Sequence, residues 1–145
     1  MKAVRLRCEY LTDPLGIGTP HPRLQWNCED GIRQSARRIV AESGGNTVWD
    51  SGRVATDSMH ADFPVTLTSR MRVTWKVMLW DENGAAGEWS EEAVFEAGLL
   101  APGDWSAEWI AGDYRPRKGR RYPADCFEKT FACGDVVRAR LYITA

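Results

Sequence analysis

The sequence has little of what metal, nucleic-acid and membrane sites need. It holds only two histidines in 145 residues, and its four cysteines lack the close paired spacing of a zinc site. The net charge is −1 and the pI about 6.1, so no overall field attracts nucleic acid or anionic lipid. The one basic run, Arg115 to Arg121, has no interleaved aromatic residue and is interpreted as a solvated loop.

No stretch approaches the roughly 20 apolar residues of a membrane span. We therefore expect no metal, cofactor, nucleic-acid partner or membrane partner.

The beginning of the sequence bears on the compartment. It lacks an apolar signal-peptide core and places Arg5 and Arg7 where leucines would be needed. As written, the sequence predicts a cytoplasmic protein, or an extracytoplasmic one if a leader was removed. Cys8 and Cys28 fall on predicted neighbouring strands, so a disulfide and free thiols are both open interpretations. Free thiols are favoured, because a cytosolic chain is kept reduced.

Helical periodicity is scarce, and the residues instead alternate between apolar and polar with period two over short runs. This alternation is typical of half-buried strands. It is clearest in RVTWKVMLW, where Val73, Trp75, Val77 and Leu79 share one face. Strands are predicted at residues 4–10, 23–29, 35–43, 47–54, 72–80 and 88–98. Between the first two, the prolines and glycines of 12–22 predict a long irregular connection.

Turn residues separate these runs about every ten residues. Gly44-Gly45-Asn46 and Asn83-Gly84 supply the positive φ angles that tight hairpins require. Short strands at this spacing, with a tryptophan central on one of them, predict an all-β fold. We expect an antiparallel immunoglobulin- or fibronectin-III-like sandwich of about seven strands over residues 1–98.

The composition changes after Gly98. Residues 99–125 are rich in turn formers and aromatics, whereas 126–131 and 136–143 alternate like strands. A strand at 136–143 needs a sheet to pair with, so residues 99–145 are interpreted as a linker and the first strands of a truncated β-domain. Alternatively, this strand could pair with the same strand of a second copy.

No catalytic constellation emerges from the pattern. Adjacent acidic residues, Asp81-Glu82 and Glu91-Glu92, point to opposite faces of a strand and cannot act on one substrate. No nucleophile-elbow pattern surrounds Ser51, and no spacing brings it to a histidine. We therefore assign no catalytic residue.

The seven tryptophans divide into two groups. Two are in phase with apolar strand faces and are predicted to be core: Trp26 and Trp75. The others lie out of phase, near strand ends or after the sandwich, and could be exposed: Trp49, Trp80, Trp89, Trp105 and Trp109. Exposed rings would serve either as a sugar-stacking platform or as an interface with another domain. The interface is favoured, with Trp105 and Trp109 as its leading residues.

Several blocks together resemble a known family. LRCEYLTDPLGIGTPHPRLQW is similar to the opening of bacterial α-L-rhamnosidases of glycoside hydrolase family 78, which follow a pattern L-x-x-E-Y-x-x-x-P-x-G-I-x-x-x-x-P-R-L-x-W. RQSARRIVAES, VWDSGRVATD, VTWKVMLWDENG, EWSEEAVFEAGLL and DWSAEWI resemble the blocks that follow, and CFEKTF with VVRARLYITA resembles the start of the next, jelly-roll-like domain. Two positions depart from the pattern: Arg37 stands where an inward tyrosine is usual, and Val73 where a corner tyrosine is often found.

The resemblance implies a role without catalysis. Family members hydrolyse terminal α-L-rhamnosides with inversion, using two carboxyl groups roughly 6.5–9.5 Å apart. In the family this pair lies on an (α/α)6 barrel beyond the residues present here. The resemblance thus implies an accessory domain that packs against or spaces the catalytic domain of the parent enzyme. The alternative is a carbohydrate-binding module for rhamnose-containing glycosides.

Overall fold

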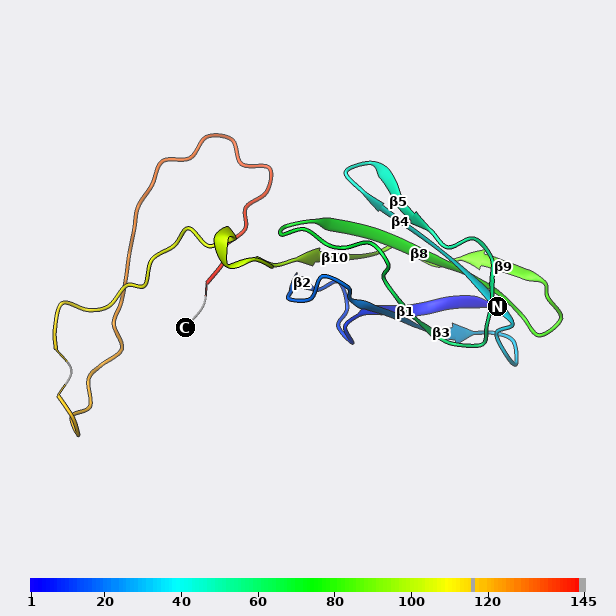
Figure 1. The fold of residues 1–145 in the computed structure, drawn as a ribbon, viewed down its shortest axis with the longest axis horizontal. Helices are drawn as coiled ribbons and strands as arrows, with labels where there is room; N and C mark the ends of the chain where they lie inside the picture. The colour runs from blue at the N-terminus through cyan, green and yellow to red at the C-terminus, as the bar shows by residue number, and fades with distance from the viewer. Residues whose placement is uncertain (116, 144–145) are drawn as a thin grey trace. The chain divides into compact units, whose positions relative to one another are not determined.

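The protein is described by a computed structural model that covers residues 1–115 and 117–143 (Figure 1). Residue 116, within the predicted basic loop, and residues 144–145 lie outside this description. The chain divides into two compact units, Met1–Trp105 and the residues from Ser106 on, and each is described by itself. No helix in the described part is long and apolar enough to cross a membrane.

The first unit is built almost entirely of strands. In chain order these are β1 Lys2–Cys8, β2 Leu15–Ile17, β3 Arg23–Glu29, β4 Ala36–Ser43, β5 Asn46–Asp50, β6 Val54–Ala55, β7 His60–Asp62, β8 Arg72–Trp80, β9 Ala86–Trp89 and β10 Ala93–Ala97. One sheet has the order β1-β3-β7; the other has β2-β10-β8-β4-β5, with β6 on β4 and β9 on β8. The predicted all-β, immunoglobulin-like sandwich is confirmed.

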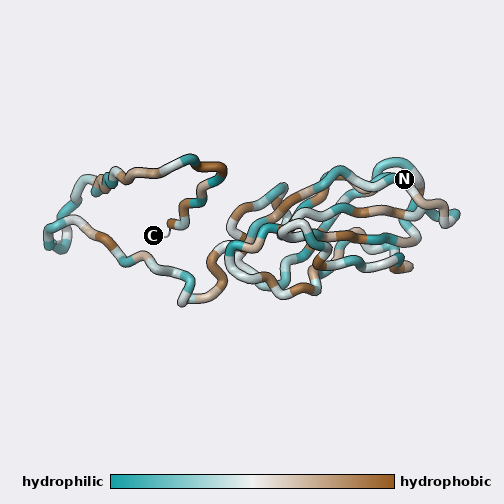
Figure 2. Tube along the Cα trace, turned by 90° about the horizontal axis from the view of Figure 1, so that it is seen from above, coloured by the Kyte–Doolittle hydropathy of each residue, from teal (hydrophilic) through white to brown (hydrophobic). Residues whose placement is uncertain are grey.

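The core is formed by the inward faces predicted from the alternation. β8 buries every second residue from Val73 to Leu79, and Trp75 at its centre is 2% exposed. β3 contributes Trp26 from the opposite sheet, so both tryptophans predicted to be core are confirmed. Phe95 of β10 packs edge-on against Phe63, with ring centroids 5.4 Å apart. The alternation along the strands is visible as changes in hydropathy in Figure 2.

The segment predicted as an irregular connection contains a short strand instead. β2 pairs in parallel with β10, so the chain leaves one sheet after β1 and joins the other. Pro14 does not prevent this, because at the sheet edge its carbonyl is free to accept the Glu96 N–H at 3.0 Å. Gly16 supplies a φ of +83° that disfavours other residues. A two-rung parallel strand leaves no period-two signature, and the prediction missed it.

The predicted strand 88–98 is divided in two. β9 and β10 both pair with β8, and Ser90 to Glu92 lie between them outside both strands. The Ser90 N–H donates to the Val77 carbonyl at 2.9 Å, and the buried Ser90 hydroxyl accepts the Val77 N–H at 3.0 Å and donates to the Glu91 carbonyl at 2.8 Å. β7 has no predicted counterpart, because Ala61 is its single buried residue and gives no alternation to detect.

From Ser106 on, the described residues form neither strand nor helix. The strands predicted at 126–131 and 136–143 are therefore not formed here. The physical reason is that a lone alternating segment cannot satisfy its backbone groups without a partner strand. Local order comes from stacked rings: Tyr114 and Tyr122 lie 5.0 Å apart at 18°, and the Tyr114 hydroxyl donates to Asp125 at 3.1 Å.

All four cysteines are free thiols. Cys8 pairs across the β1–β3 ladder with Leu24, whereas Cys28 pairs with Ala3, so the two sulfurs belong to different rungs. Burial of the Cys8 thiol, with a smaller effect of Glu9, raises its pKa to about 12. The structure thus contains no bond between Cys8 and Cys28, and the redox state of the thiols stays a prediction.

One half-buried cation lies against the apolar core. Arg37 shares the strand parity of Ile39 and Ala41, and its guanidinium carbon lies 5.7 Å from the Trp26 ring centroid. Its Nε and Nη1 are buried, and neither has a hydrogen-bond partner among the described residues. Burial also lowers the pKa of Arg37. The stacking on Trp26 thus compensates only part of the cost of removing this charge from water.

Because the contact with Trp26 does not offset the cost of burying unpaired nitrogens, we expect Arg37→Met to stabilise the sandwich. Replacing a poorly satisfied buried cation by an apolar side chain of similar length should raise the free energy of unfolding by about 1 kcal/mol. Urea unfolding of the 145-residue chain measures it. Arg53→Met is the matched control, because it removes an exposed cation from another tryptophan and should change stability by less than about 0.5 kcal/mol. A loss of stability in Arg37→Met beyond the control would contradict the prediction.

Candidate functional site

Residues considered for catalysis have local structural partners. Asp81 caps the β8–β9 turn by accepting the Asn83 and Ala85 N–H groups, and the Glu82 carboxylate accepts the Ile32 N–H at 3.2 Å. Ser51 accepts the Ile39 N–H and donates to a carbonyl, each at 2.8 Å. The described residues contain no group of three or more His, Cys, Asp or Glu that could hold a metal. The expectation that this chain has no catalytic residue stays a prediction.

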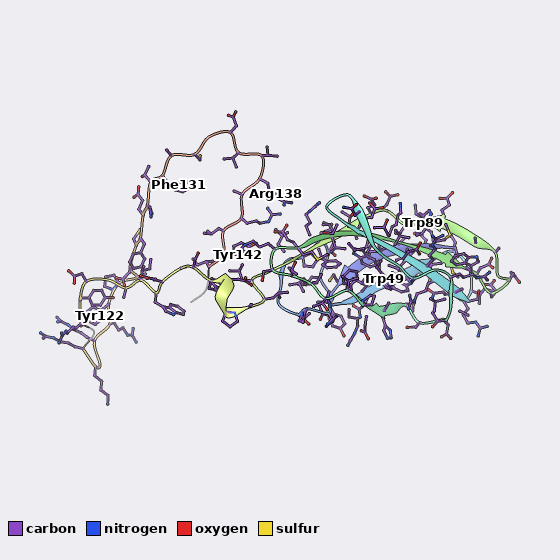
Figure 3. The ribbon with its side chains drawn as sticks, turned by 45° about the horizontal axis from the view of Figure 1, so that its top comes forward. Trp49, Trp89, Tyr122, Phe131, Arg138 and Tyr142 are labelled. Atoms are coloured by element: carbon purple, nitrogen blue, oxygen red, sulfur yellow. The ribbon has the colours of Figure 1, made fainter. Side chains whose placement is uncertain are left out.

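Trp80 and Trp89 lie half-buried on the outer face of the larger sheet, opposite to the core face of β8. Each has a cation against its ring. The Arg53 guanidinium carbon is 4.9 Å from the Trp80 ring centroid. Trp89, which is labelled in Figure 3, has two such neighbours: the Arg38 guanidinium carbon at 5.9 Å and the Lys76 Nζ at 5.4 Å from its ring centroid. A sugar stacking on these rings would compete with the protein's own cations.

Arg38 is held over Trp89 by a bidentate ion pair. Its Nε and Nη2 donate to the two carboxylate oxygens of Asp50 at 2.9 and 2.5 Å, and Asp50 also accepts the Gly52 N–H at 2.9 Å. The hydrogen bonds from Arg38, then the one from Gly52, lower the pKa of Asp50 to about 2. Since β4 and β5 carry the two partners, the hairpin predicted at Gly44-Gly45-Asn46 is what brings them together.

The other three tryptophans differ in exposure. Trp49, which the sequence left among the exposed candidates, packs edge-on against buried Phe63 with ring centroids 5.7 Å apart and belongs to the margin of the core. Trp105, at the end of the first unit, is 38% exposed. Trp109, in the second unit, is 81% exposed. Interdomain or sugar contact by these four tryptophans stays a prediction: Trp80, Trp89, Trp105 and Trp109.

The chain leaves the sandwich through a hydrogen-bonded junction. The 3-10 helix η1 Pro102–Asp104 begins shortly after β10, and the Asp104 carboxylate accepts from the Ser69 hydroxyl and from the Ala101 N–H, the latter at 3.0 Å. Ser69 in turn accepts the Leu100 N–H at 2.7 Å. The bond from Ser69 is the leading cause that lowers the pKa of Asp104. These hydrogen bonds hold the segment that follows β10 against the turn before β8. Val73, in β8, stands where a corner tyrosine is often found, so that tyrosine is not present here.

Sequence reasoning missed both the junction and a group of exposed apolar residues. Single serines and aspartates have no periodicity, so nothing marked Ser69 and Asp104 as partners 35 residues apart. Tyr10, Leu11 and Leu15 are 60%, 57% and 61% exposed, although they stand in the block that carries the family resemblance. For Tyr10 and Leu11 the signal available was their position between β1 and Pro14, where no strand requires apolar side chains.

The Arg38–Asp50 pair makes acid stability depend on Asp50. Because its pKa is about 2 in the folded chain against 3.8 normally, the pair stabilises the fold above about pH 4, and this contribution is lost as pH falls towards 2. We expect the urea midpoint to decrease between pH 4 and pH 2, and Asp50→Asn to reduce that decrease. It should not abolish it, because hydrogen bonds also lower the pKa of Glu82 and Asp104. An unchanged pH slope in Asp50→Asn would contradict the assignment.

The fold and these surfaces define an immunoglobulin-like β-sandwich whose C-terminal segment, after β10, is held to the domain by hydrogen bonds. Residues 3–101 match the family model of the Rha78A-like N-terminal immunoglobulin domain, and the chain belongs to this family. The resemblance to the amino-terminal region of family 78 α-L-rhamnosidases is thereby confirmed.

Named relatives agree with this assignment. The chain is 41% identical to the alpha-L-rhamnosidase of Streptomyces avermitilis, over 71% of this chain and 11% of the relative. It is 31% identical to that of Alteromonas sp. (strain LOR), over 94% and 17%. A crystal structure of the S. avermitilis enzyme complexed with L-rhamnose superposes with a TM-score of 0.69 at 36% identity, over 76% of this chain and 12% of that one. The chain thus spans 11–17% of the length of these curated relatives.

Proposed function

We propose that residues 1–105 act as a non-catalytic accessory domain of an α-L-rhamnosidase, packing against or spacing its catalytic domain. The observation that carries the proposal is the match of residues 3–101 to an N-terminal domain of proteins several times longer than this chain. The hydrogen-bonded exit supports it, because a fixed exit restrains the orientation of whatever follows the sandwich. The parent enzyme would hydrolyse terminal α-L-rhamnosides by inversion, with its two carboxyl groups outside these residues.

The remaining domains of the parent would then be the principal partners. Exposed apolar side chains cost solvation free energy in an isolated domain and commonly mark protein contacts. Self-association through residues 136–143 is a competing use of such side chains, since Val137 and Leu141 are 102% and 85% exposed. Sedimentation of the chain distinguishes the two, because accessory packing within one polypeptide leaves the chain monomeric.

The accessory role is tested in the parent enzyme. Removing residues 1–105 should leave kcat and KM for a small chromogenic rhamnoside within about twofold. It should accelerate thermal inactivation by about tenfold, which corresponds to about 1.4 kcal/mol of the barrier. The 145-residue chain alone should show no turnover. Turnover by the purified chain, retained when a contaminating hydrolase is excluded, would overturn the proposal, as would an unchanged inactivation rate in the shortened parent.

The alternative, a carbohydrate-binding module, is favoured by the ring of Trp105, which is partly exposed and has no cation within stacking distance among the interactions described. Titration calorimetry of the chain with L-rhamnose and a rhamnosylated flavonoid tests it. We expect no saturable heat up to roughly 10 mM sugar. This range would detect a binding free energy as weak as about −3 kcal/mol. Saturable heat that Trp105→Ala removes and Trp80→Ala retains would support the binding module instead.

A further inference from the structure

The loop after β1 and the first residue of β2 present three apolar side chains to solvent on a restrained backbone. Tyr10, Leu11 and Leu15, which we name the loop 10–15 surface, are each more than half exposed. The other exposed large apolar side chains of the first unit, such as Ile32 and Met59, stand alone in the sequence. Single exposed apolar residues are ordinary, whereas neighbouring ones mark a contact surface.

The backbone of this loop is held in an unfavourable conformation. Glu9, Tyr10 and Asp13 have φ angles of +48°, +66° and +44°, a region that residues with a Cβ seldom adopt. Three departures of this kind within five residues persist only where surrounding structure enforces them, and such departures concentrate at functional sites.

Hydrogen bonds supply that enforcement on both sides of the loop. At the β1 side, Cys8 and Leu11 exchange backbone bonds of 2.9 and 3.0 Å, and Glu9 both donates to the Arg23 carbonyl at 2.9 Å and accepts the Arg23 N–H at 2.5 Å. The Arg23 Nη1 also donates to the Tyr10 hydroxyl at 3.0 Å. At the β2 side, Asp13 accepts the Val94 N–H at 2.8 Å. The surface is therefore preorganised, which lowers the entropy lost when a partner binds.

The position of the loop favours a partner within the same polypeptide. Residues 13–17 run beside β10 to the point where the chain leaves the sandwich: Leu15 pairs with Glu96, and the Gly98 N–H donates to the Ile17 carbonyl at 2.9 Å (Figure 1). In relatives of which this chain spans 11–17%, most of the polypeptide lies outside the matched region. A domain that follows a fastened exit must begin close to that exit.

We propose that the loop 10–15 surface is the docking surface by which the sandwich binds a later domain of its parent rhamnosidase. The proposal rests on the accessory function above and names the residues that perform it. The partner surface is apolar at its centre, to cover Leu11 and Leu15, and offers a hydrogen-bond acceptor or donor to the Tyr10 hydroxyl at its margin.

The test compares a loop variant with a matched surface variant. The loop variant is Tyr10→Asn, Leu11→Ser, Leu15→Ser; asparagine is chosen because it tolerates positive φ. The control is Ile32→Ser, Met59→Ser, which removes exposed apolar side chains elsewhere on the same sandwich. Both are made in the 145-residue chain and in the parent enzyme, beside the parent that lacks residues 1–105.

In the 145-residue chain, both variants should melt within about 2 °C of the unchanged chain, because solvent-exposed side chains contribute little to its folding. In the parent, the loop variant should accelerate thermal inactivation by about threefold or more and increase cleavage by a protease near residue 105, whereas the control should change neither.

Three outcomes overturn the proposal. If the loop variant behaves like the control in the parent while removal of residues 1–105 still destabilises it, the docking surface is wrong and the accessory function stands. If the loop variant melts early in the isolated chain, the loop serves the sandwich itself. If sedimentation shows that the chain dimerises and that only the loop variant dissociates the dimer, the surface belongs to a second copy.

Discussion

The close packing of one face of β8 between two sheets is the constraint on which the structure depends. β8 is central in the larger sheet, and its buried residues meet Trp26 from β3 and Phe95 from β10. If β8 slipped by one residue, every inward side chain would turn to solvent, so this face fixes the register of β4, β9 and β10 together. Phe63 then closes the core by edge-on contacts with Phe95 and Trp49.

A second constraint follows from how the chain passes between the sheets. After β1 it crosses from the smaller sheet to the larger one and adds β2 beside β10. This crossing places the strained loop beside β10, where Asp13 accepts the Val94 N–H, and the Ser69–Asp104 hydrogen bonds hold the segment that follows β10. Both features restrain segments on the surface rather than residues in the core.

The outer face of the larger sheet is largely occupied by the protein's own side chains. Arg38, Lys76 and Arg53 contact the rings of Trp89 and Trp80, and Asp50 fixes Arg38 in place. Tryptophan therefore does not by itself indicate a sugar site in a sandwich of this kind, because a cation can cover the same ring face. The interactions of each ring decide between the two interpretations.

The sequence by itself determined the fold class, most strands, the core tryptophans and the family. These depend on period-two alternation, turn glycines and short local motifs, all of which are written within a few residues of one another. The tertiary structure alone decided the parallel pairing of β2 and the division at Ser90. It also decided which tryptophans meet cations, and the partnership of Ser69 with Asp104. These features join residues distant in the chain through single hydrogen bonds or ring contacts, and a local pattern carries no record of such pairs. The same reason explains the described residues after Trp105: alternation predicts a strand, but a strand forms only where a second one satisfies its backbone.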